Sequence, residues 1–205
     1  MTRTELKNKF NQYKYSDFER LYTAFATYLK TDYVTFNHNF PSTIGNIVVF
    51  TIRENDYVSF NDLLRNNDLL VVIKLIEGGI ETYQFNCTTD PSTNKENIAH
   101  FCTQIYTGNV GFHRGNPFRR CIRSDNGCWY FRSHVNGSTG IDIFGQIGLN
   151  IHDNNNFWNS SLGCTILESY QQAVDVYMPL IKSATNKNLI PVCQINQKFL
   201  EGYTL

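Results

Sequence analysis

The chain has 205 residues, 41% of them hydrophobic and 18% charged, which excludes an intrinsically disordered protein and favours one globular domain with a substantial core. It carries 18 basic and 18 acidic side chains, so no overall field attracts it to nucleic acid or to an anionic membrane. We expect neither as a partner. We expect a helical segment over residues 1–44 that packs on one domain over residues 45–205.

The N-terminal residues lack the apolar stretch of a signal peptide, and no later run approaches the ~20 apolar residues of a membrane span. We therefore expect a protein made in the cytoplasm. Its six cysteines include no Cys-x-x-Cys pair, and without a secretion signal we do not expect Cys121 and Cys128 to form a disulfide. The sequence contains no phosphate loop, no dinucleotide fingerprint and no plausible metal-ligand spacing, so we expect no cofactor and no metal.

Residues 3–30 predict one or two amphipathic helices. Ser16 and Glu19 form the S-x-x-E capping box that is typical of a helix start. A largely aromatic stripe recurs at helical spacing, and we expect it to pack into the core. Its members are Leu6, Phe10, Tyr13, Leu21, Phe25 and Tyr28.

From Gly45 the pattern changes to short β-rich runs separated by Asn, Asp and Gly. They cover residues 44–52, 69–76 and 81–89, a loop follows at 90–94, and shorter strands continue from Cys102 to Ile151. Residues 169–183 predict a helix that Ser169 caps and that Pro179 kinks or shortens. Residues 193–199 are a possible last strand. The fold class is therefore mainly β (α+β), with N-terminal helices and one helix after Cys164.

His152 and Cys164 are the candidate catalytic pair. If residues 146–152 form a strand, Asn150 and His152 share one face and His152 stands at the strand's end. The loop-forming residues between His152 and Cys164 then let the chain turn back and bring the two side chains together. A neighbouring imidazolium stabilises a thiolate and can later donate a proton to a leaving amine.

Gly163 permits a tight turn, so backbone N–H groups near Gly163 and Cys164 could form an oxyanion hole. A third group must orient the imidazole, and Asn150, Ser160 and Ser161 are the candidates. The alternative is structural, because a free cysteine is often buried and a single histidine usually has no catalytic role.

Four motifs occur in order along the chain: Thr88-Thr89-Asp90-Pro91, His113-Arg114-Gly115, Leu149-Asn150-Ile151-His152 and Ser161-Leu162-Gly163-Cys164. Together they resemble the catalytic domains of the L,D-transpeptidase (YkuD-like) family, in particular a phage- and prophage-encoded branch. The similarity runs from about residue 45 to 185. Two positions differ from the classical motif, where a histidine stands at the position of Leu162 and often an arginine at that of Ile166.

The resemblance implies a YkuD-like β-sandwich with Cys164 as nucleophile and His152 as general base. The implied partners are the stem peptides of bacterial peptidoglycan, which a thioester intermediate would pass to an amine or to water. It also implies a phage-encoded protein that is delivered to the cell wall.

Substrate binding is assigned to His113, Arg114 and Arg123. Guanidinium groups suit bidentate carboxylate binding, and five arginines fall between residues 114 and 132 with no lysine among them. For each arginine a solvated, salt-bridged position is the alternative. Thr89 and Asp90 could simply hold a turn. Two further hypotheses stay open: a non-catalytic virion module that binds cell-wall glycopeptide, and an effector or inhibitor of a host protein.

Overall fold

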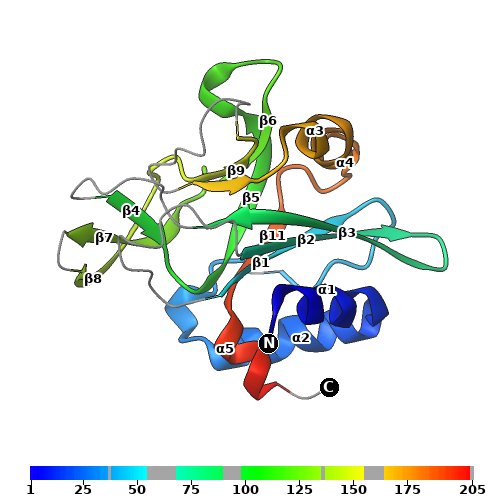
Figure 1. The fold of residues 1–205 in the computed structure, drawn as a ribbon, viewed down its shortest axis with the longest axis horizontal. Coiled ribbons are helices and arrows are strands. Elements are labelled where there is room, and N and C mark those ends of the chain that lie inside the picture. The colour runs from blue at the N-terminus through cyan, green and yellow to red at the C-terminus, as the bar shows by residue number, and fades with distance from the viewer. Residues whose placement is uncertain (37, 55–67, 90–97, 135–136, 155–163, 204–205) are drawn as a thin grey trace.

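The computed structural model describes residues 1–36, 38–54, 68–89, 98–134, 137–154 and 164–203 (Figure 1). Within them the structure is a β-rich α+β fold, as the sequence predicts. Its largest sheet is mixed and closes into a barrel in the order β1-β11-β5-β6-β9-β10-β3-β2. The barrel strands are β1 (Ile47–Arg53), β2 (Asp68–Ile76), β3 (Gly79–Thr88), β5 (Gln104–Phe112), β6 (Arg120–Arg123), β9 (Asn150–His152), β10 (Thr165–Leu167) and β11 (Ile190–Asn196).

A smaller sheet in the order β4-β7-β8 lies beside the barrel. It consists of β4 (Ile98–Phe101), β7 (Cys128–His134) and β8 (Gly137–Gly145). Two pairings in the barrel are parallel, β1 with β11 and β9 with β10, and the others are antiparallel.

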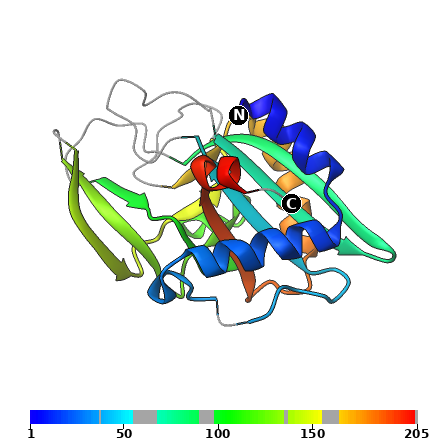
Figure 2. The same cartoon turned by 90° about the horizontal axis from the view of Figure 1, so that it is seen from below.

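The barrel wall separates two apolar clusters. Alternation along β1 shows this directly, because Val49 belongs to one cluster whereas Val48 and Phe50 belong to the other. The helices α1 (Arg3–Gln12), α2 (Tyr15–Tyr28) and α5 (Gln197–Gly202) cover the second cluster and lie on the same side of the sheet (Figures 1 and 2).

The predicted N-terminal helices form, but the predicted start of the second one is wrong. Thr2 and Glu5 form a capping box at α1. In α2, Ser16 lies inside the helix, and it is the Lys14 N–H that donates to Asp17, at 2.9 Å. The aromatic stripe is buried as expected except for Tyr28, which is 65% exposed.

The helix after Cys164 is continuous but changes its winding. Ser169 caps it as predicted, and α3 (Tyr170–Gln172) leads through the π-helical segment η4 (Ala173–Tyr177) into α4 (Met178–Ser183). Pro179 therefore does not end the helix. It lies in the first turn of α4, directly after the wider turns of η4, where its missing N–H is tolerated.

Two predicted strands differ in length from the observed ones. β9 contains only Asn150–His152, and β11 begins at Ile190 and ends at Asn196, after which the chain turns helical. All six cysteines are free thiols. Within the described residues, no helix is long and apolar enough to cross a membrane.

Candidate active site

The parallel pairing of β9 with β10 brings His152 and Cys164 together. Ile151 lies opposite Thr165 and His152 lies opposite Ile166, so Cys164 immediately precedes the strand that runs beside His152. Ile151 and Leu167 point into the core. His152 is only 6% exposed and Cys164 is half-buried. The thiol of Cys164 donates to the Gly148 carbonyl at 3.9 Å and lies close enough to His152 to raise the pKa of the imidazole.

The imidazole of His152 is oriented by the backbone of the next residue. Its Nδ1 lies 2.5 Å from the carbonyl oxygen of Asp153. A carbonyl oxygen can only accept, so Nδ1 carries a proton and donates it to that contact. In the neutral ring the lone pair is then on Nε2, the nitrogen that remains for Cys164.

The side chain of Asp153 adds a fixed negative charge beside this ring. It is fully buried, and its Oδ1 lies 3.8 Å from Nδ1 of His152. Arg119 holds the same oxygen through Nε at 2.9 Å and Nη2 at 2.7 Å. Burial opposes the ionised form, but the nearby imidazole of His152 and the hydrogen bonds from Arg119 prevail and lower the pKa of Asp153 to about 2. The carboxylate therefore stays ionised near neutral pH.

These contacts favour a charged His152. Burial acts against the cation, but the hydrogen bonds to Asp153 and Cys164 outweigh it and raise the pKa of His152 to about 9. Below that pH the ring is an imidazolium directly beside the thiol of Cys164. An adjacent imidazolium is the arrangement that stabilises a thiolate.

His113 stacks on His152. The two ring centroids are 3.9 Å apart and the rings are tilted by 30°. Burial and the neighbouring His152 lower the pKa of His113 to about 4. His113 is thus neutral when His152 is charged, which avoids two cations in contact. Its Nδ1 has no hydrogen-bond partner within the described residues.

The other predicted site residues have different surroundings. Arg114 is exposed in η3 (His113–Gly115), in a left-handed conformation with φ 50°. Arg123 is half-buried and pairs with Asp125 at 2.8 Å. The amide of Asn150 donates to the Gly148 carbonyl at 2.8 Å. Asn150 was one of the candidates for orienting the imidazole of His152, but Nδ1 of that ring contacts the Asp153 carbonyl instead. Three predicted positions, Ser160, Ser161 and Gly163, lie outside the described residues.

Sequence reasoning missed Asp153 and placed Arg119 only among the five arginines that suit carboxylate binding. A signal for Asp153 was present, because it directly follows the candidate base. Arg119 belongs to the arginine-rich interval, but its pairing with a residue 34 positions later depends on the barrel.

A second buried charge network lies near the start of β10. The Thr89 hydroxyl donates to Asp68 Oδ2 at 2.6 Å and accepts from Arg53 Nε at 2.9 Å. Its N–H also donates to Asp68, at 2.7 Å. The neighbouring Thr88 lies opposite Ile166 of β10. The threonine of the Thr-Asp-Pro motif therefore holds the ends of β1, β2 and β3 together, whereas Asp90 and Pro91 lie outside the described residues.

No family model matches the sequence, and the comparisons with curated proteins and with solved structures find no match either. The site must therefore be interpreted from its own geometry. The site contains a half-buried thiol beside an imidazole. A carbonyl oxygen orients this imidazole, and a buried carboxylate stabilises its protonated form. These are the parts of a nucleophile and its base.

Proposed function

We propose that the protein is a cysteine acyl transferase or peptidase. The observation that carries this proposal is that the pairing of β9 with β10 places Cys164 beside His152, with the imidazole oriented by the Asp153 carbonyl. In this role Cys164 attacks a substrate carbonyl, and His152 holds the thiol proton and gives it to the leaving amine. The products of this first step are a thioester on Cys164 and a free amine.

The second step resolves the thioester. An amine acceptor or a water molecule gives its proton to the now neutral His152 and attacks the carbonyl, which releases the acyl product and leaves the Cys164 thiolate beside the protonated His152. An amine acceptor gives transpeptidation and water gives hydrolysis. His113 is not a cation near neutral pH, since its pKa is about 4, and this scheme gives it no proton-transfer step. Its stacked ring excludes water from one face of His152.

The proposed substrates are the stem peptides of bacterial peptidoglycan, and the proposed fold family is the L,D-transpeptidase (YkuD-like) group in its phage-encoded branch. The four ordered motifs support this assignment. Two of them end in residues of the candidate site, His152 and Cys164, and a third begins with His113, which stacks on His152. In this proposal Arg114 and Arg123 meet the carboxylates of the substrate, and the protein acts at the cell wall.

Digestion of purified peptidoglycan tests the proposal. The wild type should change the muropeptide profile in mass spectrometry by adding or removing peptide cross-links or terminal residues, and Cys164→Ala should abolish that change. The matched control is Cys102→Ala, which removes a buried thiol that lies outside the candidate site. If the wild type sediments with insoluble peptidoglycan but leaves every muropeptide unchanged, the non-catalytic binding module is favoured instead.

A further inference from the structure

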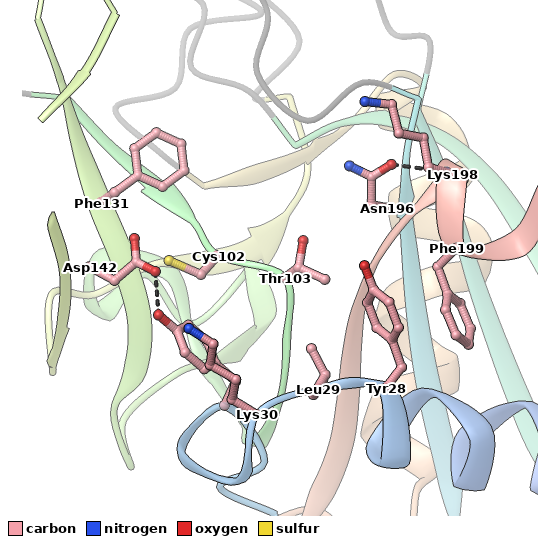
Figure 3. A pocket seen from close by; sticks show the side chains of 11 residues that line it. Tyr28, Leu29, Lys30, Cys102, Thr103, Phe131, Asp142, Asn196, Lys198 and Phe199 are labelled. Carbon is pink, nitrogen blue, oxygen red and sulfur yellow. Dashed lines mark hydrogen bonds between the residues drawn. The ribbon is translucent and has the colours of Figure 1, made fainter. Parts of the chain in front are cut away.

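A pocket of about 420 Å³ lies apart from the candidate active site (Figure 3). It forms where the end of α2, the link between β4 and β5, the β7–β8 sheet and α5 meet. His152, Asp153, Cys164 and the two residues packed on them, His113 and Arg119, do not line it.

Aromatic rings form much of the pocket wall. They are Tyr28, Tyr33, Phe131 and Phe199. Tyr28 is the member of the N-terminal stripe that the core does not bury. Figure 3 shows Phe131 on one side of the pocket, with Tyr28 and Phe199 on the other. Such walls suit a flat apolar group, because aromatic pairs gain from offset or edge contacts beyond the area that they bury.

Asn196 supplies an unpaired hydrogen-bond donor. Its side chain is the N-cap of α5, and Oδ1 accepts from the Lys198 N–H at 2.9 Å. The cap turns the oxygen toward α5 and the amide nitrogen toward the centre of the pocket (Figure 3). The residue is 6% exposed, and within the described residues its Nδ2 has no partner. Because an unpaired buried donor is unfavourable, this group favours a ligand that accepts from it.

The charges of the pocket point to the same kind of ligand. Asp142 accepts a hydrogen bond from the Tyr33 hydroxyl and interacts with Cys102. Burial and this carboxylate raise the pKa of Cys102, so its thiol stays neutral. Lys30 contributes a positive charge to the lining. Lys198 lines the pocket as well. The lining therefore carries two ammonium groups and one carboxylate, and that carboxylate is already engaged by a hydroxyl and a thiol.

We propose that this pocket binds a small carboxylate with an aromatic or similarly flat apolar body. The body packs between the aromatic walls, and the carboxylate accepts from Nδ2 of Asn196, while Lys30 adds to the positive charge of the lining. This proposal does not depend on the function proposed for Cys164.

The test uses a fluorescent residue beside the pocket. Trp129 stacks on Tyr33 with ring centroids 5.0 Å apart. The chain has 2 tryptophans, so Trp158→Phe leaves Trp129 as the sole reporter. Phenylacetate should change its emission saturably with a dissociation constant on the order of 1 mM, as expected for so small a ligand. Phenylethylamine, which has the same ring but a positive charge, should bind at least tenfold more weakly.

Asn196→Asp is the decisive variant, made in the Trp158→Phe protein. Aspartate caps a helix as well as asparagine does, so α5 is preserved, but the donor becomes a second acceptor. Phenylacetate should bind at least tenfold more weakly, a difference of about 1.4 kcal/mol. Lys30→Gln should weaken it severalfold, and Lys182→Gln, which alters an exposed lysine on α4, should have no effect.

Three results would overturn the proposal. One is the lack of any saturable change in Trp129 emission up to a phenylacetate concentration tenfold above the expected dissociation constant. Another is equal binding of phenylacetate and phenylethylamine. The third is unchanged affinity in both Asn196→Asp and Lys30→Gln.

Discussion

Replacing Asp153 by asparagine removes the negative charge beside His152 and leaves the backbone carbonyl that orients the ring. At the 3.8 Å between Nδ1 and Oδ1, two unit charges attract by about 4 kcal/mol at an effective dielectric constant of about 20, equivalent to about 3 pH units. Burial opposes the cation, and the net result is a rise in the pKa of His152 from 6.5 to about 9. Without the carboxylate, the cation keeps the burial penalty and loses this attraction.

We therefore expect Asp153→Asn to lower the pKa of His152 to roughly 6–8. The assay is an NMR titration of the His152 ring between pH 5 and 10, with His152→Gln to assign its resonance. Asp125→Asn is the matched control, because it also removes a carboxylate from an arginine pair but away from the imidazole. A His152 pKa that stays near 9 in Asp153→Asn would refute the electrostatic role given to Asp153.

Three further predictions concern stability, each read from chemical denaturation. Arg53→Met removes the buried guanidinium that donates to Thr89 and to the Phe101 carbonyl, and should cost about 3–5 kcal/mol because hydrogen bonds from a charged group are lost in the interior. Lys74→Met, at an exposed hydrogen bond to Ser183, should cost less than about 0.5 kcal/mol, and equal losses would contradict the network's role. Phe18→Ala should lower the free energy of unfolding by about 3–5 kcal/mol, because this ring on α2 is fully buried against Phe50. Phe118→Ala, at a ring that is 87% exposed, should be nearly neutral. The pKa of His113 is about 4 in the folded protein, below the ordinary 6.5. Its contribution to the free energy of unfolding is therefore complete above pH 6.5 and is lost as the pH falls toward 4. His113→Gln should flatten that acid limb by up to about 3 kcal/mol, and an unchanged limb would contradict the assigned pKa.

Local patterns predicted much of the fold. Helical spacing found α1 and α2, and β-rich runs found β1, β2 and β3. The signal is strongest for β1 and β2, because nearly all of their residues are buried. The start of α2 was missed because Lys14 is capped through its backbone N–H by the Asp17 side chain, while its own side chain carries no N-cap signal. Tyr28 was assigned to the core by its spacing alone, although it is the last residue of α2 and packs on Phe199 with most of its side chain exposed.

The candidate site was predictable only in part. The sequence indicated His152 and Cys164, and the distance along the chain allowed them to meet. The groups that orient and charge the imidazole depend on long-range pairing: Arg119 reaches Asp153 because β6 pairs with β9, and His113 reaches His152 through the β5–β6 connection. No local period encodes those contacts, so only the three-dimensional structure shows them.

The alkylation rate of each cysteine as a function of pH tests the central claim most directly, with peptide-resolved mass spectrometry in the wild type and in His152→Ala. We predict that Cys164 reacts fastest in the wild type and loses that advantage in His152→Ala. A Cys164 that reacts no faster than the buried cysteines, or equally fast in both proteins, would contradict it.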